Sequence, residues 1–408
     1  MRIIVTGLIA QHYTLAGVSW DYIQYCIGLK QLGYDVYYFE DSGEWPYNLD
    51  GGKNGNDWVE KDCHKNISYL KKLFDRYGLN DRWAYRFPLK DEWYGMSDQK
   101  RNEVLLTADI LINVSGTLEN PEKYESVKRL VYIDSDPGFT QVKLKLNQEE
   151  FSKRVATHHC HFSFGESLPL NLKDDQFDWK PTRTPIILSE WAAEKTYRNE
   201  YTTIMNWTSY KPLIFEGISF HQKDIEFIKF LELKRKLKNI CFEVALSKLQ
   251  HKNWQSSLPD HFAGEDDNKK ISFPTPGDLL SHYGWKVVDP AEKCKDMDAY
   301  RDYILQSKAE WSVAKGGYVV SKPGWFSCRS ACYLAAGRPV IVQDTGFDKV
   351  LPIGEGILSF NTIEEAMENI LDVEANYSLH AKRAREIAVE YFDSDKVLQQ
   401  LVEKAVSN

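Results

Sequence analysis

The stretch from residue 309 to residue 347 constrains the fold more than any other part of the chain. It reads AEWSVAKGGYVVSKPGWFSCRSACYLAAGRPVIVQDTGF. An apolar segment, a glycine turn, a helical pattern, a second glycine and another apolar segment are followed by the loop Asp344-Thr345-Gly346. This order predicts two parallel strands joined through a helix, with loops at the carboxyl ends of both strands. Loops of this kind, followed by helix N-termini, bind phosphorylated ligands.

The N-terminal residues predict a second unit of the same kind. RIIVTG (2–7) has the composition of a buried strand, residues 18–33 carry apolar positions at helical spacing, and YDVYYFED (34–41) is predicted as the next strand. A chain of 408 residues is too long for one ordinary core. The sequence therefore predicts an α/β protein with two Rossmann-like domains that face each other across a cleft.

The domain boundaries follow from the place where this alternation is interrupted. Residues 175–195 contain prolines and charges and are predicted to link the domains. We therefore predict an N-terminal domain at 1–185, a C-terminal domain at 186–390 and a terminal helical segment at 391–408. Further strands are predicted at 108–116, 128–138, 159–166, 201–207, 239–247 and 284–290.

Residues 41–100 interrupt the first domain with a polar and aromatic segment. The segment contains GGKNGN (51–56) and a helical pattern at 64–78. Because it does not continue the strand–helix alternation, we interpret it as an insertion or rim that shapes a binding cleft.

Composition excludes several classes of protein. The net charge is −8 and the pI about 5.8, without a basic stripe, so sequence-independent DNA binding is not expected. No apolar stretch approaches the ~20 residues of a membrane span, and MRIIVTGLIA is read as a first strand rather than a signal peptide. The 7 cysteines form no CxxC pair, which favours reduced thiols in a cytoplasm.

A metal site is not predicted. His158, His159 and His161 cluster around one strand, where His159 and His161 would share a face. The sequence identifies no third ligand, so these histidines are interpreted as structural.

Taken together, the chain resembles the nucleotide-sugar glycosyltransferases of the GT-B fold. The resemblance is sharpest at LAAGRPVIVQDTGF (334–347) and at the first strand–helix–strand unit, whose helix ends in LKQLGYDV (29–36). It implies that the C-terminal domain binds a nucleotide-sugar, with a UDP-sugar expected, and that the N-terminal domain binds an acceptor bearing a hydroxyl. It also implies that no cofactor or metal is required and that the helix near residues 391–406 crosses back to the first domain.

One departure from the family pattern concerns stereochemistry. Many retaining members carry two glutamates seven residues apart around the donor helix, whereas Cys332 occupies the second of these places here. The ribose and sugar contacts of that subgroup therefore do not carry over, and Arg329 or Ser327 would have to hold the ribose. We accordingly favour inversion over retention.

Transfer of a sugar from a nucleoside diphosphate requires neutralisation of the leaving diphosphate. The helix start around Gly324 and Ser327 would direct backbone amides at phosphate, and Arg329 one turn later could form a bidentate contact. Its alternative role is pairing with a surface carboxylate. The resemblance also places a diphosphate-binding lysine at Lys223, although Asp224 could compensate that lysine at a helix start. Lys315, at the end of a strand, is a further candidate.

Two other places in the second half are candidates for donor contacts. Trp285 lies at the strand end that receives the nucleobase in this class, with core packing as the alternative. Asp344, Thr345 and Gly346 form the loop that touches donor sugar hydroxyls in this class, although an Asp-x-Gly turn is also ordinary turn chemistry.

In the N-terminal half, His12 lies in the loop after the first strand. Inverting members of the family place a catalytic histidine in that loop, and histidine suits general base catalysis. Asp136, at the tip of a neighbouring predicted strand, could orient His12 or act as the base itself. Gly17 would let the backbone approach the donor. A solvated His12 with no catalytic role is the alternative.

The sequence therefore predicts a cytoplasmic enzyme that transfers a sugar from a UDP-sugar to a hydroxyl acceptor, with a small molecule or glycan preferred to DNA. A nucleotide-sugar 2-epimerase of the same fold, a non-catalytic relative that binds a partner, and a transferase acting on modified DNA bases remain as alternatives. The segment at 41–100 argues against the epimerase, which needs no separate acceptor pocket, and the net charge of −8 argues against DNA as the acceptor.

Overall fold

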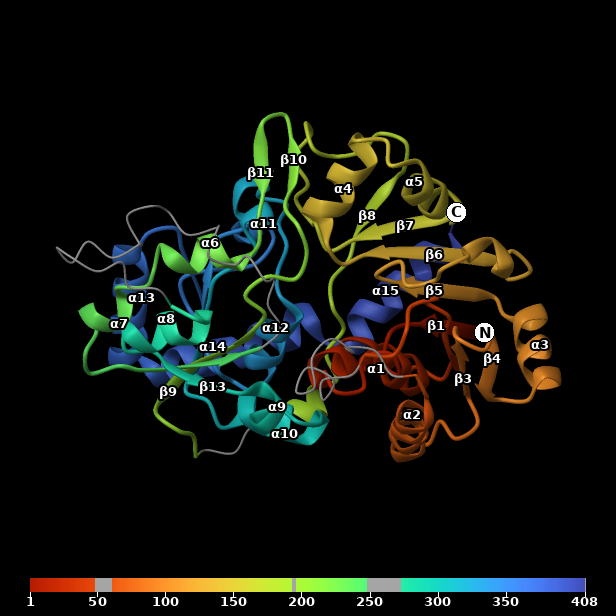
Figure 1. Cartoon of the computed structure of the whole chain (residues 1–408), viewed down its shortest axis with the longest axis horizontal. Coiled ribbons are helices and arrows are strands. Elements are labelled where there is room, and N and C mark those ends of the chain that lie inside the picture. Colours follow the sequence, from red (N-terminus) through yellow and green to blue (C-terminus); the bar gives the residue numbers. More distant parts are fainter. Residues whose placement is uncertain (48–60, 193–195, 248–272, 408) are drawn as a thin grey trace. The chain divides into compact units, whose positions relative to one another are not determined.

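The computed structural model describes residues 1–47, 61–192, 196–247 and 273–407. Residues 51–56, part of the predicted insertion, lie outside these ranges. The chain divides into two compact units (Figure 1). Unit 1 comprises Met1–Glu190, Lys295–Tyr300 and Glu390–Asn408, and unit 2 comprises Trp191–Cys294 and Arg301–Val389.

Unit 1 is built on an eight-stranded sheet with the order β4-β3-β2-β1-β5-β6-β7-β8. Its strands are parallel except β4, which pairs antiparallel with β3. Ile3, Ile4 and Val5 are fully buried at its centre, as expected for a strand covered on both faces. The strands are β1 (Arg2–Thr6), β2 (Asp35–Glu40), β3 (Trp83–Phe87), β4 (Glu92–Gly95), β5 (Ile110–Val114), β6 (Arg129–Asp134), β7 (Cys160–Ser163) and β8 (Trp179–Pro181).

The segment predicted as an insertion contributes two strands to this sheet. β3 pairs with β2, and β4 forms the edge of the sheet next to it. Trp83, Tyr85 and Phe87 are buried, so the aromatic residues of β3 belong to the core. The interpretation as a rim was therefore wrong for residues 83–95, because aromatic residues in a short run also suit a strand that is covered on both faces.

The predicted linker at 175–195 also contains sheet structure. β8 is the last strand of unit 1, and Ile186 forms a parallel bridge with Asp393. The boundary between the units falls between Glu190 and Trp191.

Helix α15 (Ser394–Val406) belongs to unit 1, although it is last in the sequence. It packs on α1 (Ala16–Gln31), where Gly28 faces Leu398 and Ser394 closely. The other helical segments of unit 1 are α2 (His64–Arg76), α3 (Asp98–Thr107), η2 (Pro121–Tyr124), α4 (Pro137–Lys145) and α5 (Glu149–Ala156), while η3 (Leu188–Trp191) lies at the boundary.

Unit 2 has a six-stranded parallel sheet with the order β13-β12-β9-β14-β15-β16. Numbered within the sheet, this is the order 3-2-1-4-5-6 of a Rossmann fold, in which ligands bind beyond the carboxyl ends of the strands at the reversal of strand order. Here that reversal lies between β9 and β14. The strands are β9 (Glu200–Met205), β12 (Cys241–Leu246), β13 (Lys286–Val288), β14 (Ala309–Ser312), β15 (Val340–Gln343) and β16 (Ile357–Phe360), and a separate antiparallel hairpin is formed by β10 (Leu213–Phe215) and β11 (Ile218–Phe220).

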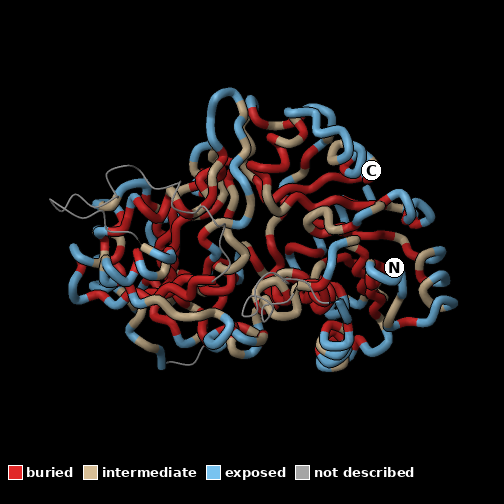
Figure 2. Tube along the Cα trace, in the orientation of Figure 1, coloured by how far each residue is buried: buried red, intermediate tan, exposed pale blue. Residues whose placement is uncertain are grey.

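The core of unit 2 is rich in aromatic rings. Trp311 stacks on Phe360 with ring centroids 5.6 Å apart, and Figure 2 shows buried segments in the interior of the unit. No helix in the described ranges of the chain is long and apolar enough to cross a bilayer. The helical segments of unit 2 are α6 (Lys223–Ile228), α7 (Leu233–Lys236), α8 (Pro276–His282), α9 (Pro290–Lys293), α11 (Gly316–Ser321), α12 (Cys328–Ala335), η6 (Phe347–Lys349), α13 (Ile363–Ala375) and α14 (Tyr377–Ile387), while α10 (Met297–Leu305) and η7 (Ala388–Phe392) span the unit boundaries.

Two glycines before β16 differ in how closely the rest of unit 2 packs against them. Gly354 and Gly356 both have positive φ, but a Cβ on Gly356 would lie 2.6 Å from the backbone nitrogen of Ala384, whereas Gly354 has nothing within 4 Å. We expect Gly354→Ala to cost about 1 kcal/mol through backbone strain alone. Gly356→Ala should cost at least about 2 kcal/mol more, because the backbone of α14 must move. Urea unfolding of both variants measures the difference, and equal costs would contradict this packing.

Candidate functional site

A narrow cavity lies at the carboxyl edge of the unit 2 sheet. It is lined by the ends of β14 and β15, the segment before α12 and the start of α6, in agreement with the ligand position of Rossmann folds. The enclosed space is about 20 Å³, enough for one water-sized group, so a larger ligand would occupy it only in part. Its lining includes Lys223, Ser312, Trp325, Ser327, Arg329, Gln343 and Thr345.

Arg329 is directed into the protein. Its Nε donates to Glu310 Oε1 at 2.7 Å, its Nη2 to Ser312 Oγ at 2.8 Å and its Nη1 to the Ile204 carbonyl at 2.7 Å. Glu310 is completely buried. The carboxylate partner is thus a core residue of β14 and not the surface group considered from the sequence, and the guanidinium is held rigidly at the cavity wall.

Lys223 is the first residue of α6, as the sequence predicts. Burial, followed by the charges of Arg329 and Lys315, lowers the pKa of Lys223 well below its usual value, although Glu310 acts in the opposite direction. Its ammonium group has no hydrogen-bond or ion-pair partner within the described ranges. Asp224 is buried, and its Oδ1 has no hydrogen-bond partner in the described part of the chain, so it does not provide the expected compensation.

Lys315 lies immediately before α11, at the end of β14. Its Nζ donates to the Tyr210 hydroxyl at 2.8 Å and lies 4.7 Å from the centre of that ring. Tyr318 stacks on Trp325 at 4.3 Å between centroids. These rings place an aromatic wall beside the lysine.

The loops at 324–327 and 344–346 are tied to each other. The Gly324 amide donates to the Thr345 carbonyl at 2.9 Å, and the Thr345 hydroxyl donates to the Trp325 carbonyl. The Gly324 amide is therefore occupied within the protein. Ser327 precedes α12, and its side chain makes no capping hydrogen bond.

Asp344 is held by two donors. The Gly346 amide donates to its Oδ1 at 2.7 Å, and Lys322 Nζ donates to its Oδ2 at 2.6 Å. Burial would raise the pKa of Asp344, but these donors outweigh it and lower that pKa. The carboxyl group is thus ionised and oriented at the end of β15.

Trp285 lies in the core of unit 2 rather than at the cavity. Its side chain is buried against Phe227, Phe242 and Trp311, and its indole nitrogen donates to the Leu231 carbonyl at 2.9 Å. Core packing, the alternative interpretation of the sequence, therefore describes this side chain, and the predicted ring contact to a nucleobase is not formed by it. Sequence position alone could not separate the two roles, because both require an aromatic residue at a strand end.

His12 lies in the loop after β1, at 5.6 Å from the ring of Tyr47. Burial lowers the pKa of His12 to about 4, and its Nδ1 has no hydrogen-bond partner in the described part of the chain. The imidazole is therefore neutral near pH 7. In the sheet, β5 lies between β1, which precedes the His12 loop, and β6, which precedes Asp136. Asp136 is the N-cap residue of α4.

Two buried carboxyl groups near these residues were missed by the sequence analysis. Asp134, at the end of β6, accepts from the Asp136 amide and the Ser163 hydroxyl, each at 3.0 Å, and burial raises its pKa to about 7. Glu40, at the end of β2, accepts from the amides of Ala10 and Gln11 at 2.8 and 2.6 Å. Glu40 thus positions the loop that carries His12. A carboxylate at the end of a buried strand was the available signal for both.

Gly17 lies at the start of α1, and a Cβ there would come within 3.2 Å of the ring of Tyr300. Its small size therefore makes room for that ring. The three histidines near β7 have backbone or side-chain partners, among them Asn113 for His158 and the Val155 carbonyl for His161. No cluster of three or more residues suited to a metal occurs in the described ranges.

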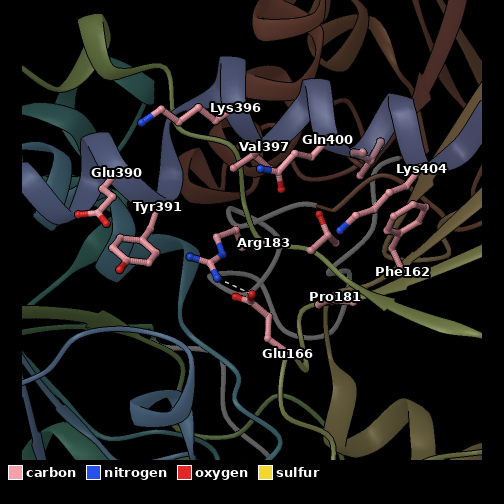
Figure 3. A pocket seen from close by; sticks show the side chains of 12 residues that line it. Phe162, Glu166, Pro181, Arg183, Glu390, Tyr391, Lys396, Val397, Gln400 and Lys404 are labelled. Carbon is pink, nitrogen blue, oxygen red and sulfur yellow. Dashed lines mark hydrogen bonds and ion pairs between the residues drawn. The ribbon is translucent and has the colours of Figure 1, made fainter.

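A wider groove of about 300 Å³ lies in unit 1, between the ends of β7 and β8 and one face of α15. Arg183 is ion-paired with Glu166 and lies over the ring of Tyr391 at 5.4 Å (Figure 3). Lys404 points from α15 into the same groove. The groove therefore offers both charges and an aromatic face to a polar molecule.

The role of Glu40 can be tested with Glu40→Gln. Each carboxylate oxygen of Glu40 accepts a hydrogen bond from a backbone amide, and the variant would lose one of these bonds. We therefore expect the free energy of unfolding to fall by about 1–3 kcal/mol. Burial raises the pKa of Glu40 to about 7, so the folded protein retains a proton that the unfolded chain releases. The contribution of Glu40 to the free energy of unfolding of the wild type therefore falls as the pH rises from about 4.5 to about 7, and the difference in stability between wild type and variant should narrow over that range.

Urea unfolding at about pH 5 and about pH 8 measures both effects. Glu122→Gln, at an exposed position of the same unit, is the matched control. A deficit that is independent of pH, or the same in the control, would contradict the assignment.

Comparison with known proteins adds structural relatives. No family model and no curated protein matches the sequence. An α-glucosyltransferase solved with UDP and a 13-mer DNA superposes with a TM-score of 0.58 at 14% identity, covering 99% of both chains. HepE of Anabaena, solved with UDP and glucose, gives 0.57 at 10% identity and 100% coverage of both chains. The sucrose-phosphate synthase of Thermosynechococcus elongatus gives 0.50 at 11% identity, covering 99% of this chain and 98% of that chain. The predicted fold class is thereby confirmed: the chain has the GT-B fold, with two Rossmann-like domains.

Proposed function

We propose that this protein is a glycosyltransferase that transfers a sugar from a UDP-sugar to a hydroxyl acceptor. The observation that carries the proposal is the unpaired Lys223 ammonium, partly withdrawn from water next to Arg329 and Lys315. Such a cluster of like charges is costly unless an anion binds there. The α-glucosyltransferase and HepE, which share the fold, were solved with UDP.

The leaving diphosphate is the natural anion for this cluster. Lys223 and Lys315 would contact the phosphate oxygens, while Arg329, anchored by Glu310, would contribute a fixed positive charge at the cavity wall. Fixed charges that stabilise a developing anion lower the barrier for bond cleavage. In this proposal, protein cations neutralise the leaving group and no metal is required.

The remaining donor contacts are assigned to the loops around the cavity. Ser327 and Thr345 line the cavity and would contact the nucleotide. The Ser327 side chain makes no capping hydrogen bond to α12. The ionised carboxylate of Asp344 can accept hydrogen bonds from sugar hydroxyls, as the family resemblance implies. Gly346 lets the chain turn at this point, since its φ is +84°.

The acceptor hydroxyl must lose a proton during transfer. We assign the base to unit 1, to His12 or Asp136, in an inverting reaction. His12 is neutral and can accept a proton at Nδ1, but its lowered pKa makes it a weak base in the free protein. Asp136 begins α4 beside the buried Asp134. Activity measurements on His12→Gln and Asp136→Asn distinguish the two assignments.

For the acceptor, we propose a small molecule or glycan. The groove of unit 1 presents Arg183, Tyr391 and Lys404 to a polar ligand of limited size. A net charge of −8 is unfavourable for an extended DNA contact, although one structural neighbour was solved with DNA.

Ligand-induced stabilisation tests the donor assignment. We expect UDP or a UDP-sugar at millimolar concentration to raise the melting temperature, since a ligand that binds the folded state stabilises it. Lys223→Ala should weaken UDP binding by at least about tenfold, or about 1.4 kcal/mol. Lys382→Ala, at an exposed position of α14, is the control. The assignment is wrong if no uridine nucleotide stabilises the protein. If UDP-sugars bind but no acceptor is glycosylated, the non-catalytic alternative holds.

A proton-linkage measurement tests the role of Lys223 separately. Because the pKa of Lys223 is lowered in the free protein, a bound diphosphate should raise it and draw a proton onto the amine. UDP binding should therefore take up protons. The affinity for UDP should fall as the pH rises above the pKa that Lys223 has in the free protein. Calorimetry in buffers of different ionisation enthalpy measures the uptake. Lys223→Arg, which stays charged, should reduce it, and an unchanged uptake would contradict the assignment.

A further inference from the structure

Glu226 is a buried carboxylate outside the set of predicted site residues. It lies in the first turn of α6 and is fully buried. It accepts from His221 Nε2 at 2.8 Å, from Lys229 Nζ at 2.7 Å and from Gln343 Nε2 at 2.5 Å. Burial would raise the pKa of Glu226, but these donors outweigh it and lower that pKa. The group is therefore an ionised carboxylate inside the protein.

This carboxylate connects the loops that carry the candidate donor residues. Gln343, at the end of β15, uses its Oε1 to accept from the Ala314 amide at 3.1 Å. Ala314 precedes Lys315, and Gln343 precedes Asp344. Glu226 itself lies one turn after Lys223. A single hydrogen-bonded network thus joins the start of α6 with the ends of β14 and β15.

His221 joins this network from the segment that precedes Lys223 in the sequence. Its Nε2 faces Glu226, and its Nδ1 lies 3.2 Å from the Ser219 carbonyl. The Glu226 carboxylate can only accept a hydrogen bond, so Nε2 is the donor in that contact. Lys229 pairs with the same carboxylate, and Lys315 adjoins the helix start on which the ring packs.

The ring is also clamped against the start of α11. A Cβ on Gly316 would lie 2.0 Å from His221 Nε2, so only glycine leaves space for the imidazole. The backbone contributes as well, since the Gly316 amide donates to Gln222 at 3.2 Å and the Gly317 amide donates to His221 at 3.0 Å. Side chain and backbone together hold the two residues before Lys223 against the two residues after Lys315.

We propose that His221, hydrogen-bonded to Glu226 and packed on Gly316, is the positioning residue that sets the spacing of Lys223 and Lys315 for a diphosphate. The inference rests on the proposed function, because it assigns the spacing to a ligand of that chemistry. Without the imidazole, Glu226 loses one of its donors and the start of α6 loses its packing on the start of α11. Diphosphate affinity should then fall, because the two lysines no longer keep their spacing.

The first measurement compares UDP with uridine by calorimetry. Uridine carries the same base and ribose but no phosphate, so its affinity does not depend on the spacing of the two lysines. His221→Gln should weaken UDP binding about tenfold and leave uridine binding unchanged. Equal weakening of both ligands would overturn the proposal.

The second measurement compares UDP affinity between variants by calorimetry. Gly316→Ala should weaken UDP binding about tenfold, because its Cβ would displace the imidazole of His221. His282→Gln, at an exposed position of α8, should bind UDP like the wild type.

The outcomes separate the two proposals. If the wild type binds UDP and both variants bind equally well, the positioning role of His221 is wrong while the proposed function stands. A weakening that is equal for UDP and uridine indicates a purely structural role and also overturns the inference. If the wild type does not bind UDP, the proposed function fails and the inference fails with it.

Discussion

The site is built around positively charged side chains that are partly withdrawn from water at the carboxyl edge of the unit 2 sheet. Lys223 has no ion-pair partner in the described ranges, and Arg329 is already engaged by Glu310. Desolvated like charges are unfavourable without a counter-anion, so the free protein holds this edge in a state that a diphosphate would relieve. The rigid parallel sheet makes this possible, because its aromatic core holds the strand ends in place around the cavity.

Two buried carboxylates hold the positively charged side chains around the cavity in fixed positions. Glu310 anchors Arg329 from β14, whereas Glu226 gathers the start of α6 and the end of β15. Glu310 is paired with Arg329 and Glu226 with Lys229, which is the usual condition for charge inside a protein. The two networks border the same cavity, so the positions of the lysines depend on residues that would not themselves touch a ligand.

Much of this architecture could be predicted from the sequence, because the signals are local. Strand–helix alternation and the glycine turns identified both sheets, and the start of α6 at Lys223 was predicted correctly. The partners of buried groups could not be predicted, since Arg329–Glu310 and Glu226–Gln343 join residues that are far apart in sequence. For the same reason, Trp285 could not be assigned to the core, nor β3 and β4 to the sheet. The order of strands, in which β5 lies between β1 and β6, could not be predicted either.

The position of a bound diphosphate tests the central claim most directly. A crystal structure of the protein with UDP should show phosphate oxygens within hydrogen-bonding distance of the Lys223 ammonium, at the carboxyl ends of β14 and β15. The account is contradicted if UDP binds elsewhere in the molecule, or if Lys223 and Arg329 point toward bulk water while the nucleotide is bound.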